Sequence, residues 1–313
     1  MFIDRLIDGI QEKNNPTVVG LDPKIEYVPS FIREAAFKEF GTNLKGASEA
    51  ITRFNKMLID AIYDLVPAVK PQLAYYEMYG PDGLHAFDET CKYAKSKGLL
   101  VIADGKRNDI GTTAEAYSKA FLGSTEIDLE IRQKAFDVDA LTVSPYLGVD
   151  GIKPFVDDCA KYSKGIFVLV KTSNKSSGQL QDLVTQDCRS IYEIMAGYVS
   201  EWGKNVIGKY GYSSVGAVVG ATYPNQAKLL RSIMKNAYIL VPGYGAQGGT
   251  ARDCANSFNN DRLGAIVNAS RSIMCAYKSE AWKNEYGEDR FAQASRAEVL
   301  RMKNDLNEAL GKK

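Results

Sequence analysis

Histidine, paired cysteines and long apolar runs are scarce or missing in this chain of 313 residues. Its single histidine, His85, excludes a multi-histidine metal site and leaves any Ser-His-Asp triad dependent on that one residue. The five cysteines are widely spaced and form no C-x-x-C pair. This pattern argues against a zinc site or a disulfide framework, and it favours a reduced, cytoplasmic protein.

The chain also lacks an excess of charge and a segment suited to a membrane. Its 39 basic and 38 acidic residues give a formal net charge of +1, which offers no support for binding to nucleic acid or to a membrane surface. No apolar run approaches the roughly 20 residues that a membrane span requires. The opening segment, MFIDRLIDGIQEKNN, is amphipathic and carries acids, so we expect a helix and not a signal peptide.

No interior segment is rich enough in Pro, Gly or Ser to divide the chain, so we expect a single domain over residues 1–313. Apolar, β-rich runs alternate with amphipathic helical segments, which favours parallel βα units. The expected strands are 17–21, 68–74, 99–103, 140–143, 165–170, 215–220, 238–241 and 265–267. The expected helices are 48–65, 82–97, 113–121, 151–160, 187–210, 224–235 and 290–310.

About eight such units predict a (β/α)8 TIM barrel with an additional N-terminal helix. A doubly wound open sheet is the competing architecture, but it normally carries a glycine-rich turn after its first strand. Here the first expected strand ends in VGLDP, without the G-x-G-x-x-G pattern.

The segment DGKRNDIGTT, residues 104–113, follows the apolar run 99–103. Side chains alternate along a strand, so Asp104 and Lys106 are expected to point the same way at its end. Asp109 comes just after, where the chain turns. Two acids and a lysine therefore gather at the mouth of a strand, where α/β proteins place their ligands.

Two segments near the C-terminus, PGYGAQGGT at 242–250 and NASR at 268–271, predict a phosphate site. Glycines let backbone N–H groups approach an anion, and the arginine of the second segment, Arg271, can hold phosphate through two hydrogen bonds. In barrels, the loops after the seventh and eighth strands commonly bind phosphate. The alternative is that the glycine-rich loop only joins two elements tightly and that Arg271 lies on the surface. The occurrence of both segments after neighbouring strands favours a phosphate site.

Lys70 ends the second expected strand, so a barrel would bring it near Asp104, Lys106 and Asp109. A structural ion-pair network is the alternative, but buried charges are costly and four at the functional face favour chemistry. An ammonium flanked by carboxylates suits proton donation. A carboxylate could also repel an anionic substrate group that leaves as a neutral gas. This is the logic of a decarboxylase that uses no metal and no organic cofactor.

The run DGKRNDIGTTA fits the D-x-K-x-x-D signature of the orotidine 5'-phosphate decarboxylase family. PGYGAQGG, NASRSI and AVKPQLAYYE resemble the phosphate-binding and second-strand segments of that family. The resemblance covers residues 17–277 and points to the longer bacterial branch. It implies a homodimeric (β/α)8 barrel that converts orotidine 5'-monophosphate to uridine 5'-monophosphate (UMP) and CO2, the last step of de novo pyrimidine nucleotide synthesis.

The resemblance also implies individual roles. Lys106 would protonate C6 as CO2 departs, Asp104 would lie against the substrate carboxylate, and Lys70 would hold Asp104 and reach the ribose. Asp109, with Thr113, would serve the ribose in the partner subunit's site, so that both active sites are shared across the dimer. The remaining substrate-binding residues would be Asp22 at a ribose hydroxyl, Ser173 at the pyrimidine, and Gln247, Gly248 and Arg271 at the phosphate, with Gln247 bridging towards the base.

The segment KTSNKSSGQLQ departs in spacing from the E-M-S-x-x-G pattern of the short-branch members. Lys171 and Asn174 are therefore possible substitutes for Ser173. The segment 23–46 has no counterpart in the resemblance, and its role stays open.

Two other functions remain open at this point. A Mg²⁺-dependent sugar-phosphate decarboxylase or synthase of the same barrel group shares the D-x-K-x-x-D core. Such an enzyme holds its metal with acids that include a second-strand glutamate, where this chain has Lys70, and Glu77 is a weak substitute. A non-catalytic barrel that binds a phosphate ligand would keep Gln247 and Arg271 without needing the charged array.

Overall fold

The computed structural model describes residues 1–311, so the predicted domain end at residue 313 lies outside the described residues. Eight parallel strands form a closed barrel in the order β1-β10-β9-β8-β7-β6-β3-β2. They are β1 (Thr17–Leu21), β2 (Ala68–Pro71), β3 (Leu100–Arg107), β6 (Ala140–Val143), β7 (Gly165–Lys171), β8 (Ser213–Val219), β9 (Ala237–Val241) and β10 (Ala265–Ala269). The predicted (β/α)8 barrel is confirmed, and the open doubly wound sheet is wrong.

Neighbouring residues of each strand face different cores, as the alternation of side chains along a strand requires. Val18, Leu100 and Ile102 belong to a cluster inside the barrel. Their neighbours Val19 and Val101 belong to the larger cluster between the strands and the surrounding helices. Because both faces are buried, the strands appear in the sequence as continuous apolar runs.

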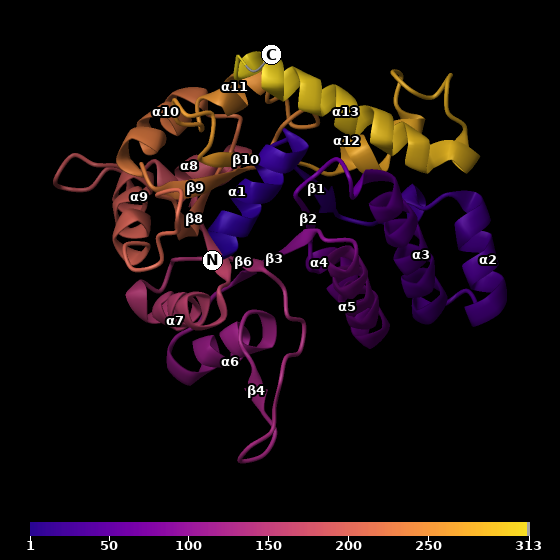
Figure 1. Cartoon of the computed structure of the whole chain (residues 1–313), viewed down its shortest axis with the longest axis horizontal. Helices are drawn as coiled ribbons and strands as arrows, with labels where there is room; N and C mark the ends of the chain where they lie inside the picture. Colours follow the sequence, from indigo (N-terminus) through magenta and orange to yellow (C-terminus); the bar gives the residue numbers. More distant parts are fainter. Residues whose placement is uncertain (312–313) are drawn as a thin grey trace.

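Helices surround the barrel and follow most of its strands (Figure 1). The longer ones are α1 (Phe2–Lys13), α2 (Ser30–Phe40), α3 (Leu44–Ile62), α5 (Gly80–Ser96), α6 (Gly111–Phe121), α7 (Lys153–Tyr162), α9 (Ile191–Trp202), α10 (Pro224–Ile233) and α13 (Phe291–Ala309). Short turns of helix are α4 (Ala74–Glu77), α8 (Gly178–Gln181), α11 (Ala251–Ala255) and α12 (Arg271–Met274). The expected strand 68–74 ends at Pro71, and the expected helix 187–210 is confined to α9.

The N-terminal helix α1 closes the amino end of the barrel. Its residues Phe2, Ile3 and Leu6 are buried in the same cluster as the barrel interior. The ring of Phe2 packs over the first residue of β7, Gly165, where an added Cβ would lie 2.2 Å from a ring carbon. The barrel therefore opens only at the carboxyl ends of its strands.

The segment 23–46, whose role the sequence left open, consists of a helical turn at Ile25–Tyr27, helix α2 and the start of α3. Asn43 begins α3 by accepting a hydrogen bond from the backbone N–H of Gly46 at 3.0 Å. Helices α2 and α3 pack side by side on the outside of the barrel (Figure 1). The inserted helix thus thickens the barrel wall, and the turn before it contributes Tyr27 to the carboxyl-end cavity.

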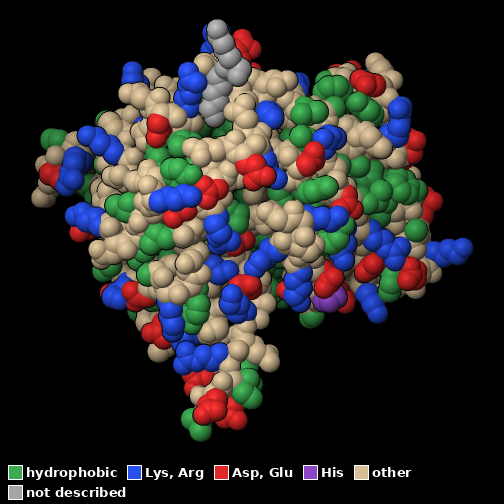
Figure 2. Space-filling model, viewed as in Figure 1, with side chains coloured by type: hydrophobic (Ala, Val, Ile, Leu, Met, Phe, Trp, Pro, Cys, Tyr) green, Lys and Arg blue, Asp and Glu red, His purple; other side chains and the backbone are tan. Residues whose placement is uncertain are grey.

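A hairpin between α6 and β6 was not predicted. It pairs β4 (Thr125–Glu126) with β5 (Arg132–Gln133) in antiparallel fashion. Figure 2 shows it as a projection from the body of the molecule, with hydrophobic and acidic side chains at its tip. Two-residue strands carry too little hydrophobic pattern to be recognised from sequence.

Candidate active site

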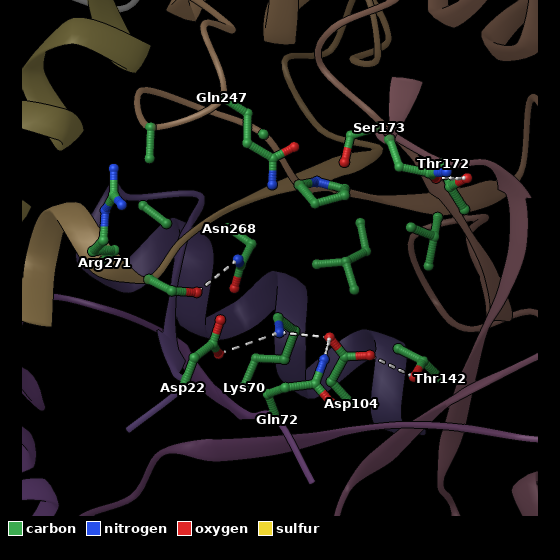
Figure 3. Close-up of a pocket in the computed structure, with 18 of the residues that line it drawn as sticks. Asp22, Lys70, Gln72, Asp104, Thr142, Thr172, Ser173, Gln247, Asn268 and Arg271 are labelled. Carbon is green, nitrogen blue, oxygen red and sulfur yellow. Dashed lines mark hydrogen bonds and ion pairs between the residues drawn. The ribbon is translucent and has the colours of Figure 1, made fainter. Parts of the chain in front are cut away.

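A cavity of about 770 Å³ lies at the carboxyl ends of the barrel strands. Of the residues predicted for the site, Asp22, Lys70, Asp104, Lys106, Ser173, Gln247 and Arg271 line it. They come from β2, β3 and the segments that follow β1, β7, β9 and β10, far apart in sequence. Figure 3 shows Asp22, Lys70 and Asp104 along one side of the cavity, with Arg271 and Ser173 at opposite ends of the other side.

Asp104 is the centre of the charged array. One carboxylate oxygen, Oδ2, accepts hydrogen bonds from Lys70 Nζ at 2.7 Å and from Gln72 Nε2 at 2.9 Å. The other, Oδ1, accepts from Lys106 Nζ at 2.6 Å and from Thr142 Oγ1 at 2.9 Å. With four donors on two oxygens, the carboxylate is fully paired and its orientation is fixed.

These contacts determine the charge state of the pair at the bottom of the cavity. Burial alone would raise the pKa of Asp104, but the ammonium groups of Lys70 and Lys106 outweigh burial and hold that pKa well below its usual range. Burial opposes the charged form of Lys70, whereas Asp104 and Asp22 raise its pKa above the ordinary lysine value. At neutral pH Asp104 is therefore ionised and Lys70 is protonated.

Lys106 reaches the array through an unusual backbone. Its φ is +45°, in the left-handed region that residues with a Cβ seldom adopt. Its N–H donates to Thr142 Oγ1 at 3.0 Å, so Thr142 holds both the Lys106 backbone and the Asp104 carboxylate. Strained backbone conformations of this kind concentrate at functional sites. The Lys106 side chain is 46% exposed, so its ammonium group faces the open cavity.

Asp109 and Thr113 do not line the cavity. The Asp109 carboxylate accepts a hydrogen bond from the N–H of Ile110 at 2.8 Å, and Thr113 is exposed on the first turn of α6. Three of the four charged residues predicted for catalysis are thus brought together within one chain. The fourth, Asp109, lies outside this cavity.

The predicted phosphate-binding residues lie on the loops after β9 and β10. Gln247 and Arg271 line the cavity, and within residues 1–311 the Arg271 guanidinium has no hydrogen-bond or ion-pair partner. Gly243, Gly245 and Gly248 have positive φ angles, which explains the glycines of this loop. Gly248 lines a separate hollow with Thr250 on the other side of the loop. Its predicted contact with phosphate stays a prediction.

The Orotidine 5'-phosphate decarboxylase / HUMPS family model matches residues 18–284. The chain belongs to this family. Proteins named orotidine 5'-phosphate decarboxylase are 42% identical over 309 residues in Caldicellulosiruptor saccharolyticus, covering 99% of each chain, and 44% identical over 305 residues in Rhodopirellula baltica, covering 97% of this chain and 98% of the relative. The structure of Leishmania donovani OMP decarboxylase superposes with a TM-score of 0.74 at 27% identity, covering 99% of both chains.

The resemblance found in the sequence is therefore confirmed, and so is the prediction of an enzyme of the carboxy-lyase class. No helix within residues 1–311 has the length and apolar character needed to cross a membrane.

The alternative function, a Mg²⁺-dependent enzyme acting on a sugar phosphate, requires a cation site in the cavity. Lys70 Nζ lies 2.7 Å from Asp104 and 3.9 Å from Asp22, so an ammonium group already faces both carboxylates. Glu77 pairs with Arg107. No cluster of three His, Cys, Asp or Glu side chains suited to a metal occurs in the described part of the chain. These residues do not fit a Mg²⁺ site, because positive charge repels the ion.

Three cavity residues escaped sequence reasoning. Gln72 and Thr142 complete the bonding of Asp104. Asn268 directs a buried side-chain oxygen without a partner into the same space, as does Asp22. Each lies within one residue of the carboxyl end of a barrel strand, which the sequence could have indicated, but the sequence reasoning was directed at charged side chains. Of the substitutes considered for Ser173, Asn174 lines the cavity, whereas Lys171 is buried behind the loop.

Proposed function

We propose that the protein converts orotidine 5'-monophosphate to UMP and CO2, the closing step of de novo pyrimidine nucleotide synthesis. The observation that carries the proposal is the Lys70–Asp104–Lys106 array at the mouth of the barrel, opposite the unpaired Arg271. The names of the full-length bacterial relatives support it. So does the balanced charge of the chain, which suits a small nucleotide better than a nucleic acid or a membrane as binding partner.

The cavity suggests how the nucleotide would lie. The phosphate would bind Arg271 and Gln247, which line the cavity. The contact with Gly248, which follows Gln247 in the same loop, stays a prediction. The pyrimidine would reach towards Ser173. The unpaired carboxylate oxygen of Asp22 is free to accept a hydrogen bond from a ribose hydroxyl, beside Lys70. The phosphate would thus meet a positive charge, and the ribose and the base would meet side chains that form hydrogen bonds.

The reaction would begin with the substrate carboxylate held against Asp104. Two carboxylates in contact repel each other, and this repulsion is lost when one leaves as neutral CO2. The bond from C6 to the carboxylate breaks, its electron pair stays on C6, and a proton from Lys106 Nζ completes the new C–H bond. Lys106 then recovers a proton from water. The step uses no metal and no organic cofactor, because the ammonium groups supply the positive charge.

The site would be completed by a second copy of the chain. Asp109 and Thr113 lie outside their own cavity, and the loop 147–151 packs against Asp109. Around them Ile110, Tyr146 and Leu147 are exposed, with Tyr146 at 76%. Clustered exposed apolar side chains mark interaction surfaces. We therefore propose a homodimer in which this surface brings Asp109 and Thr113 to the partner's ribose.

A cytoplasmic location follows from the proposed function and from the free cysteines, three of which are buried. The alternative function, a Mg²⁺-dependent enzyme acting on a sugar phosphate, predicts the opposite response to chelation.

The deciding experiment is an assay of the purified protein with orotidine monophosphate in excess EDTA. We expect full decarboxylation, followed as the loss of ultraviolet absorbance. Inactivity on this nucleotide, together with Mg²⁺-dependent turnover of a keto-sugar phosphate, would establish the alternative. Tight binding of UMP without any turnover would instead point to a non-catalytic binding barrel.

A further inference from the structure

Lys171, the last residue of β7, is a fully buried lysine that takes no part in the reaction described above. Its ammonium group lies 2.6 Å from Asp182 Oδ1 and donates to Ser177 Oγ at 3.1 Å. It also stands over the ring of Tyr223, 4.4 Å from the centroid. A fully buried charge is costly unless it is paired and hydrogen-bonded, so these contacts are needed for Lys171 to occupy this place.

The two residues that pair with the Lys171 ammonium group, Ser177 and Asp182, both belong to the loop 172–182, which follows it in the chain. The loop is closed a second time at its base, since Gln181 Oε1 accepts from the backbone N–H of Thr172 at 3.0 Å and Gln181 Nε2 donates to Thr172 Oγ1 at 2.9 Å. Thr172 and Ser173 line the cavity at the end away from Arg271 (Figure 3), and Gln181 also lines the cavity. The ion pair at Lys171 and the contacts of Gln181 therefore fold the loop back so that Ser173 faces the cavity.

The loop after β8 supports the same arrangement. Tyr223 OH donates to the carbonyl of Asn174 at 3.3 Å, and Thr222 Oγ1 donates to the carbonyl of Ser173 at 3.3 Å. Gly220 lies so close that an added Cβ would be 2.8 Å from the Cα of Ser173. The segment is polar, KTSNKSSGQLQD, and offers little apolar surface of its own to hold it. Charge pairing and hydrogen bonds have to fix it.

We propose that Lys171 is a positioning residue that holds the loop 172–182 in the conformation that presents Ser173 to the base of the nucleotide. This inference rests on the proposed function. Lys171 acts from behind the loop and touches no substrate. It should therefore affect recognition of the pyrimidine and leave recognition of the phosphate unchanged, because Gln247 and Arg271 lie on other loops.

The test compares the Lys171→Met and Asp182→Asn variants with the unmodified protein. Lys175→Met is the matched control, since Lys175 is an exposed lysine of the same loop. Two affinities are measured by calorimetry, one for UMP and one for ribose 5-phosphate, which lacks the base. Hydrogen exchange of the backbone amides in 172–186 is measured alongside.

We expect both variants to bind UMP about tenfold more weakly or worse, a loss of about 1.4 kcal/mol. Their affinity for ribose 5-phosphate should stay within about twofold of the unmodified protein, and exchange should accelerate in the loop alone. The control should match the unmodified protein in all three measurements.

Unchanged UMP affinity in both variants would overturn the inference, and so would an equal loss for UMP and ribose 5-phosphate. If Lys171→Met does not fold, Asp182→Asn decides, because Asp182 is half exposed and its replacement leaves no cavity. If the unmodified protein fails to bind UMP, the proposed function falls, while the exchange rates still decide whether Lys171 holds the loop.

Discussion

Replacement of Asp104 by Asn tests the electrostatic account of the site through stability alone. The substitution keeps the shape of the side chain and removes its charge. Lys70, which is 5% exposed, would keep only an amide oxygen and the carboxylate of Asp22 at 3.9 Å. Breaking a buried ion pair by removing one partner lowers the free energy of unfolding by about 3–5 kcal/mol. Because Lys70 keeps two weaker partners, we expect a loss of about 3 kcal/mol, at the lower end of this range.

The reverse substitution, Lys70→Met, is expected to cost less. Asp104 would still accept hydrogen bonds from Lys106, Gln72 and Thr142, so the buried charge stays paired. Asp22, whose side chain is 27% exposed, would lose only a distant ion pair at 3.9 Å. We expect a loss of about 1–2 kcal/mol, typical of one charged hydrogen bond. Asp104→Asn should therefore destabilise the protein more than Lys70→Met, because Asp104 has more remaining partners than Lys70.

Thermal unfolding at one fixed protein concentration measures both losses. An entropy of unfolding of about 2.1 cal/mol/K per residue gives about 0.7 kcal/mol/K for the chain, so about 3 kcal/mol lowers Tm by about 4–5 °C. Asp109→Asn is the control. Within residues 1–311 of its own chain its carboxylate accepts a hydrogen bond from the N–H of Ile110 alone, and the substitution should change Tm by less than about 1 °C in the absence of a nucleotide.

The loss of stability caused by Asp104→Asn should also depend on pH. The folded-state pKa of Asp104 is depressed, so its ionisation stabilises the protein above the unfolded pKa of about 3.9, and this contribution declines as pH falls towards the folded value. The Tm difference between the unmodified protein and Asp104→Asn should be constant from pH 7 to 5. Below pH 4 the difference in unfolding free energy between the two proteins should narrow by about 1.4 kcal/mol per pH unit, and the Tm difference should narrow with it. An unchanged Tm at pH 7, or a gap at pH 3 as wide as the gap at pH 7, would refute the reasoning.

The remaining predictions concern turnover. Lys106→Ala should lower kcat on the order of 10⁴-fold, because the proton donor is lost, while UMP affinity measured by calorimetry is kept; unchanged turnover would remove Lys106 from the mechanism. Mixing inactive Lys106→Ala and Asp109→Ala proteins should restore about a quarter of the sites, since each hybrid dimer has one intact site; no recovery despite subunit exchange shown by mass spectrometry would count against shared sites. Arg271→Ala should raise KM about 10–100-fold in steady-state assays, because a charged hydrogen bond to phosphate is lost, and an unaltered KM would place the phosphate elsewhere.

The sequence predicted the barrel and its charged array well because both rest on local patterns. Continuous apolar runs mark buried strands, and residues at strand ends converge once the barrel closes. Lys70, Asp104 and Lys106 were found in this way. The left-handed backbone at Lys106 could not be predicted, because nothing in DGKRND marks a residue with a Cβ for that conformation.

Other features depend on contacts between distant segments. Lys171 was considered as a substitute for Ser173 because the spacing of KTSNKSSGQLQ departs from the E-M-S-x-x-G pattern, and only the folded loop shows it paired behind the cavity. Gln72 and Thr142 became visible as partners of Asp104 only when three strands were placed side by side. The hairpin at 125–133 has strands too short for a periodic pattern.

The closed amino end of the barrel bears on how the products leave. Helix α1 seals that end with Phe2 and Ile3, so no passage leads from Asp104 through the barrel to the opposite face. A CO2 molecule released beside Asp104 has to depart through the same mouth that admits the nucleotide. Residues of the loops at 172–182 and 242–250 line that mouth, so under the proposed reaction the gas and UMP would leave past the same residues. The two products would thus share one exit in each turnover.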